Sequence, residues 1–79
     1  MEDYVGVYLN NEASFAGPFK VYVEDHRLMA DFGPGPLSLR KIAPDRFEDA
    51  RNNEVVFTRN PEGIVSIIHW QIWAGEKVE

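Results

Sequence analysis

Prolines and glycines divide this sequence into short segments. Prolines stand at positions 18, 34, 36, 44 and 61, and glycines stand at positions 6, 17, 33, 35, 63 and 75. Both residue types are unfavourable inside helices, so few of the windows between them can hold a helix of average length. Strands, which average about five or six residues, fit these windows. The spacing therefore predicts an all-β chain.

Within these windows, apolar residues alternate with other residues, as they do when successive strand side chains point to opposite faces. The expected strands cover residues 4–10, 19–24, 27–32, a segment that begins at 37, a short element around 47, then 54–58 and 64–73. The element around Phe47 is open between a strand and a single helical turn, because Pro44 and Asp45 before it are also a helix-start signal.

Turn-forming residues join these strands closely. Gly33–Pro36 alternates glycine with proline, which suits neither a helix nor a central strand, and Asn60–Gly63 has the residue order of a type I turn. Short connections predict a small antiparallel meander of about seven to eight strands that curls into a barrel or half-barrel, because closure removes unpaired edges. In a barrel this small, side chains nearly fill the interior.

The chain length, composition and charge narrow the class of protein. The 79 residues suffice for one domain over residues 1–79, in which the polar segment 74–79 is expected to be a frayed tail. The chain has no cysteine and relies on aromatic residues, 13% of the total, for its core. A net charge of −5 disfavours nucleic acid and anionic membranes as partners, and no apolar stretch is long enough to span a bilayer, so we expect a soluble protein. Lack of cysteine does not fix the compartment.

The last expected strand, residues 64–73, is apolar on both faces. Strict alternation places Ile64, Ile68, Trp70 and Ile72 on one face and Val65, Ile67, His69 and Trp73 on the other. Since one face of an antiparallel strand usually meets solvent, the second face needs a cover. We hypothesise that Trp73, Ile67 and Val65 contact a second domain or a second copy of the chain, the alternative being that the tail folds over them.

Gly6 interrupts the first expected strand. A glycine inside a strand indicates a bend or a close approach by another group. One hypothesis is that the first and last strands pair and that Trp70 covers Gly6, while simple curvature of the barrel is the other.

No group of residues has the pattern of a catalytic or metal site. Ser38-Leu39-Arg40-Lys41 matches the Ser-x-x-Lys motif of β-lactamases, but that motif needs a helix, and residues three apart in a strand point to opposite faces. His26 and His69 lack a second ligand at the usual spacing. The sequence thus predicts no catalytic residue, no metal and no cofactor, and therefore not an enzyme.

Several motifs follow one another in the order of a known family. Residues 4–8 read Tyr-Val-Gly-Val-Tyr, Asp25 and Leu28 flank a turn, residues 44–47 read Pro-Asp-Arg-Phe, and 55–59 with 63–65 form a closing hairpin. This order resembles the lipocalin-like accessory domain found at the C-terminus of β-lactamase-related serine hydrolases. His26 departs from the family, which often has glycine there. The resemblance implies a lipocalin-like fold and a module that packs beside a hydrolase domain without doing its chemistry.

These observations lead to one function and one alternative. The first is a non-catalytic β-barrel accessory or interaction domain, with a homodimer or a hydrolase-type domain as partner. The alternative is a free-standing carrier of a small apolar ligand, bound at the barrel mouth near Tyr4, Tyr8, Tyr22 and the tryptophans. The candidate ligand or interface residues are Trp70, Trp73, Ile67, Val65, Tyr4 and Tyr8.

Overall fold

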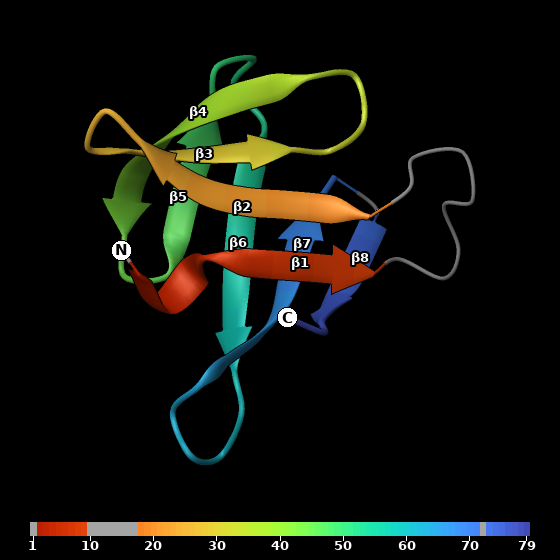
Figure 1. The fold of residues 1–79 in the computed structure, drawn as a ribbon. Coiled ribbons are helices and arrows are strands. Elements are labelled where there is room, and N and C mark those ends of the chain that lie inside the picture. Colours follow the sequence, from red (N-terminus) through yellow and green to blue (C-terminus); the bar gives the residue numbers. More distant parts are fainter. Residues whose placement is uncertain (1, 10–17, 72) are drawn as a thin grey trace.

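The computed structural model describes residues 2–9, 18–71 and 73–79. These residues form a short 3-10 helix, η1 (Glu2–Tyr4), and the strands β1 (Gly6–Leu9), β2 (Phe19–Glu24), β3 (Arg27–Asp31), β4 (Pro36–Ala43), β5 (Arg46–Asp49), β6 (Glu54–Arg59), β7 (Val65–Trp70) and β8 (Trp73–Lys77). Each strand pairs antiparallel with the next, and β8 pairs with β1, which closes the barrel (Figure 1). The predicted all-β meander and its closure are confirmed.

Alternating side chains from the strands fill the barrel interior. In β2, for example, Phe19 and Val21 are buried while Lys20 between them is exposed. The buried apolar residues of the described chain are Tyr4, Tyr8, Phe19, Val21, Leu28, Ala30, Phe32, Leu39, Phe47, Val55, Phe57, Val65 and Ile68. Leu37, Trp70 and Trp73 pack against this cluster and are only partly buried.

The connections show why the strands end where they do. The turn predicted at Asn60–Gly63 is present, with the Gly63 N–H donating to the Asn60 carbonyl at 2.9 Å. The element around Phe47 is the strand β5 rather than a helical turn. It follows a two-residue turn, in which Pro44 has a φ fixed by its ring and Asp45 has a φ of 60°, as in a type II turn.

The predicted last strand is two strands, and the expected frayed tail is wrong. A turn that contains Gln71, with a φ of 55°, separates β7 from β8 and pairs Trp70 with Trp73. β8 therefore includes most of residues 74–79, because it supplies the ladder that closes the barrel against β1. Residues 10 and 72, which were placed in predicted strands, lie outside the described residues.

The predicted faces of the last segment are also wrong. A register shift occurs between β6 and β7, where Thr58 pairs with Ile67 but Arg59 pairs with Val65. The extra residue reverses the alternation, so Val65 points into the core and is 2% exposed, whereas Ile67 remains half-buried.

The first strand pairs with the last strand β8, through Glu76 and Lys77, which lie outside the predicted last strand 64–73. Trp70 does not cover Gly6. A Cβ added at Gly6 would collide with the carbonyl oxygen of Glu79 and would lie 2.6 Å from Cε of Lys77. The Val7 N–H donates to the same Glu79 oxygen at 3.2 Å. Gly6 thus makes room for the last residues of the chain itself.

Candidate functional site

The tryptophans and Tyr4, which are candidate site residues, lie at opposite ends of the barrel. Trp70 and Trp73 form a cross-strand pair where β7 meets β8, and cross-strand partners share a face, so the prediction that they point to opposite faces is wrong. Tyr4 precedes β1 and therefore lies at the other end, beside the end of β8. We call these the tryptophan end (Phe19, Phe32, Asp49, Trp70 and Trp73) and the tyrosine end (Tyr4, Asp45, Phe47, Phe57 and Arg59).

The predicted sets do not assemble into one site. Of the expected contact surface, Val65 is in the core, Trp73 packs against the core, and Ile67 alone remains on the outer side, opposite Thr58 and Glu76. The tyrosines Tyr4 and Tyr8, expected at a ligand-binding mouth, are both buried in the core. Tyr8 is fully buried, and its hydroxyl donates to the Tyr4 carbonyl at 2.7 Å. Burial raises the pKa of the Tyr8 hydroxyl.

At the tryptophan end, aromatic rings pack around a buried carboxylate. The Trp70 ring stacks on Phe32 with centroids 4.3 Å apart and an interplanar angle of 2°, and it meets Phe19 edge to face. Trp70 Nε1–H donates to Oδ2 of Asp49 at 3.0 Å. The indole thus has a hydrogen-bond acceptor although it sits largely in an apolar cluster.

Asp49 is 3% exposed and organises the loop that follows β5. Its Oδ1 accepts the backbone N–H groups of Arg51 at 2.8 Å and Asn53 at 2.9 Å, and its Oδ2 also accepts from the Asn53 side chain. Burial raises the pKa of Asp49, but the hydrogen bonds from Asn53, Trp70 and Arg51 outweigh burial and hold it below its ordinary value. Asp49 is therefore a charged group with its acceptor capacity in use.

At the tyrosine end, Asp45 joins the 3-10 helix to the barrel. Its Oδ1 accepts the Tyr4 hydroxyl at 2.7 Å, and its two oxygens accept Nε and Nη2 of Arg59 at 3.0 and 3.1 Å. Arg59 also donates to the Gly63 carbonyl at 2.8 Å and reaches Asp3 at 3.4 Å. This contact fixes the helix over the open end of the barrel, where Tyr4 packs against Phe47 and Phe57.

The protonation states at the tyrosine end follow from these contacts. The hydrogen bond from Arg59, together with that from Tyr4, lowers the pKa of Asp45. Burial, followed by the hydrogen bond to Asp45, raises the pKa of Tyr4. A carboxylate, a guanidinium and a neutral phenol therefore coexist near neutral pH, each with a partner. This arrangement holds parts of the fold together and offers no ionisable group without a partner.

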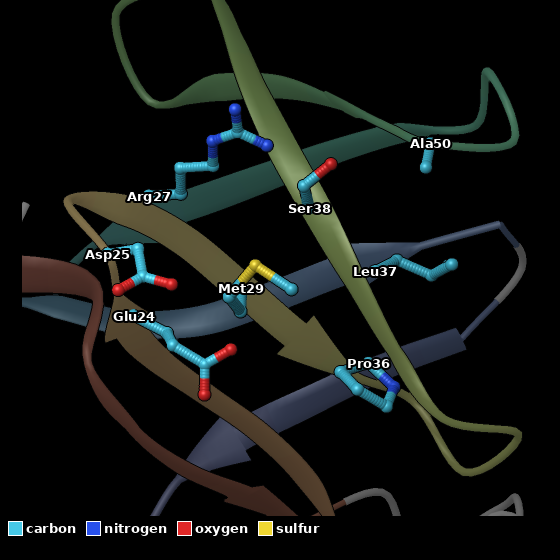
Figure 2. Close-up of a pocket in the computed structure, with 8 residues that line it drawn as sticks. All are labelled: Glu24, Asp25, Arg27, Met29, Pro36, Leu37, Ser38 and Ala50. Carbon is cyan, nitrogen blue, oxygen red and sulfur yellow. The ribbon is translucent and has the colours of Figure 1, made fainter.

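A groove lies on the outer face of the barrel, across β2, β3 and β4 (Figure 2). It has a volume of about 620 Å³. Its lining residues are Glu24, Asp25, Arg27, Met29, Pro36, Leu37, Ser38 and Ala50. The acidic residues lie at the turn between β2 and β3, on the tyrosine side, while Pro36 and Ala50 lie toward the tryptophan end. The groove thus runs lengthwise along the barrel.

A second, smaller hollow of about 280 Å³ shares Ser38 and Ala50 with the groove. It is lined further by Arg40 and Glu48, which form an ion pair at 2.6 Å. Ser38 lies in β4 and pairs across the outer face with Met29, whereas Lys41 pairs with the buried Phe47. The predicted divergence of Ser38 and Lys41 in a strand is present.

The sequence indicated Asp45 only as part of a helix-start signal and of the motif at residues 44–47, and it assigned neither Asp45, nor Asp49, nor the groove to a site. The motif that reads Asp49-Ala-Arg-Asn-Asn53 carried a signal, because aspartate often accepts backbone N–H groups two residues on and asparagine tolerates a positive φ. Asn52 indeed has a φ of 67°. The groove had no such signal, since it depends on the register of three strands.

The described residues contain neither a metal-binding cluster nor a membrane-spanning helix. In the ranges 2–9, 18–71 and 73–79, no cluster of three or more histidine, cysteine, aspartate or glutamate side chains could hold a metal ion. No helix in the same ranges is long and apolar enough to cross a membrane.

Comparison of the chain with family models, with curated proteins and with solved structures finds no match. The resemblance to lipocalin-like accessory domains accordingly rests on the sequence motifs that carry it.

Proposed function

We propose that this chain is a non-catalytic accessory or interaction domain, a β-barrel that packs on a partner domain or on a second copy of itself. The observation that carries this proposal is the distribution of exposed apolar side chains. Among the described residues, the large exposed apolar side chains are Leu9, Val23, Ile42, Ile64 and Val78. All of these except Leu9 lie at or next to the tyrosine end.

Their exposure is substantial. Ile64 is 59% exposed, Val78 is 52% exposed and Ile42 is 45% exposed. Apolar side chains that gather on one part of a surface favour contact with another protein, because association removes them from water. Glu2 and Glu79 lie at the same end, since η1 precedes β1 and the Glu79 carbonyl accepts from Val7. A domain fused at either terminus would therefore emerge beside this apolar rim.

The filled interior of the barrel also favours an interaction domain over a carrier of a small apolar ligand. Tyr8, Phe19, Phe32 and Ile68 are at most 1% exposed and occupy the space in which a ligand of a larger barrel would bind. The polar groups at both ends are engaged with one another rather than directed at a cavity.

Sedimentation and native mass spectrometry test the proposal. We expect protein taken directly from cells to run as a homodimer or as a stoichiometric complex with another chain. On dilution, the Ile64→Lys variant should dissociate at a higher concentration than the matched Leu9→Lys variant. A monomer at all concentrations that carries a small molecule would contradict the proposal and favour the carrier. Turnover of simple esters or β-lactams that survives repurification would contradict its non-catalytic part.

A further inference from the structure

The groove differs from both barrel ends in the state of its polar side chains. At the ends, the carboxylates of Asp45 and Asp49 have partners within the barrel. In the groove, the side chains of Glu24, Asp25, Arg27 and Ser38 make no hydrogen bond and no ion pair to any described residue. Their hydrogen-bonding capacity is therefore available to a ligand.

The strands beside the groove cannot accept another strand. β2 pairs with β1 and β3, β3 pairs with β2 and β4, and β4 pairs with β3 and β5. Their backbone N–H and C=O groups are therefore already used in ladders, which excludes binding by strand addition. A ligand of this groove is recognised through side chains.

The shape of the groove favours a long ligand over a compact one. Glu24, Asp25, Pro36 and Ala50 are all exposed, so the groove is open along its length. Small-molecule sites usually enclose most of their ligand, about 70–90% of its surface. An extended peptide gains contact area along an open groove instead, with every second side chain directed at the surface.

The charges and apolar groups specify which side chains such a peptide presents. The groove is lined by two carboxylates, those of Glu24 and Asp25, and by one guanidinium, that of Arg27, and the whole chain carries a net charge of −5. Figure 2 shows Met29 between the acidic pair and Leu37, with its thioether directed into the groove. Methionine adapts its shape to different apolar partners.

We propose that the groove binds an extended segment of a partner protein, with a lysine or arginine side chain on Glu24 and Asp25 and an apolar side chain on Met29. The cation complements the excess of negative charge in the groove, and the apolar residue covers the half-buried side chain of Met29. This inference rests on the proposed interaction function, to which it adds a second binding surface beside the apolar rim and the chemistry of the partner segment.

Titration of the isotope-labelled protein with defined peptides, followed by amide NMR shifts, tests the assignment. The probe is a blocked pentapeptide with a lysine and a leucine separated by one residue, and the comparison peptide has glutamate in place of lysine. We expect saturable shifts confined to residues 24–29, 36–38 and 50 with the lysine peptide, and weaker binding of the glutamate peptide. Higher salt should weaken binding of the lysine peptide, because the charges involved are exposed.

A matched pair of variants separates the groove from general charge effects. Glu24→Gln should lower the affinity for the lysine peptide about two- to fivefold, which is the range expected for loss of one exposed ion pair. Glu62→Gln removes the same charge from the exposed turn between β6 and β7 and should leave binding unchanged. Both side chains are exposed, so circular dichroism should show an unaltered fold.

Other outcomes overturn the proposal. Absence of saturable shifts at millimolar peptide, shifts elsewhere on the barrel, equal binding of the two peptides, or equal effects of the two variants would each exclude the groove as this site. Failure of the proposed function is distinguishable, because it appears in the sedimentation experiment. A dimer or complex that dissociates at the same concentration in Glu24→Gln as in the unchanged protein, and at a higher concentration in Ile64→Lys, would retain the interaction function and remove only the groove.

Discussion

At the tryptophan end, Asp49 is almost fully buried and accepts from four neutral donor groups, whereas at the tyrosine end Asp45 is partly exposed and shares its oxygens between a phenol and a guanidinium. Asp45 lies in a hairpin connection and Asp49 directly precedes one, and both hold an aromatic residue over the core. The two ends differ in which groups stabilise the charge of the aspartate. Local amides and an indole do so at one end, and a cation from β6 does so at the other.

The largest effect is expected from Asp49→Asn. The amide would keep one acceptor oxygen for the loop, but its NH₂ group would face Trp70 Nε1–H and the Asn53 side chain, which are also donors. Leaving buried donors unpaired should cost about 2 kcal/mol, which corresponds to a fall in melting temperature of about 8–16 °C for a domain of this size. Urea unfolding with an unchanged m value measures it.

Glu48→Gln is the control for this substitution, because Glu48 is the neighbouring acid in β5 but pairs with the largely exposed Arg40. Its cost should be about 0.5 kcal/mol or less. Equal losses for the two variants would show that burial of Asp49 contributes little and would remove the contrast between the two ends.

A smaller effect is expected from acid. The pKa values of Asp45 and Asp49 are both lowered in the folded protein, so the stabilisation by each carboxylate is present above the unfolded value of about 4 and is lost as the pH falls below it. Unfolding free energies measured between pH 7 and pH 2.5 should decrease toward acid, and Asp45→Asn should flatten that decrease.

Salt then tells the two ends apart. The cost of Asp45→Asn should shrink in about 1 M NaCl, where the Debye length is about 3 Å, because its guanidinium partner is partly exposed. The cost of Asp49→Asn should stay constant, since its donors carry no charge. The reverse result would mean that a cation does not stabilise Asp45 and that neutral donors do not stabilise Asp49.

The smallest effect concerns two strained turns, one at each end. His26 at the tyrosine end has a φ of 64°, and Gln71 at the tryptophan end has a φ of 55°. Both side chains are exposed, and glycine adopts this conformation at lower cost than either residue. His26→Gly and Gln71→Gly should each stabilise the protein by about 0.5–1 kcal/mol. Chemical unfolding measures both, and a loss with either variant would mean that its side chain contributes a contact.

Much of the fold could be predicted from the sequence, because most of its determinants are local. Alternation places Phe19 and Val21 inside, and the Asn60–Gly63 turn has its own residue code. The hairpin at Gln71 was missed because it lacks the glycine, proline or asparagine that usually marks a turn, so β7 and β8 read as one strand.

The sites were harder to predict because they depend on pairing between strands. The register shift that turns Val65 inward is one residue long and has no composition signal. The Trp70–Asp49 contact joins residues 21 positions apart, and the Arg59–Asp45 contact joins residues 14 apart. Neither pair has a fixed spacing that a motif could capture.

The contact between Glu79 and Val7 has a consequence for circular permutation of the chain. Since the ladder closes through β1 and β8, no strand has to come first. A short linker between the present ends, with new ends opened at the exposed Gly33–Pro34 turn, would give a circular permutant that keeps every strand pair. For the same reason, the barrel is suited to insertion as a cassette into a surface loop of a host protein, because its entry and exit points adjoin.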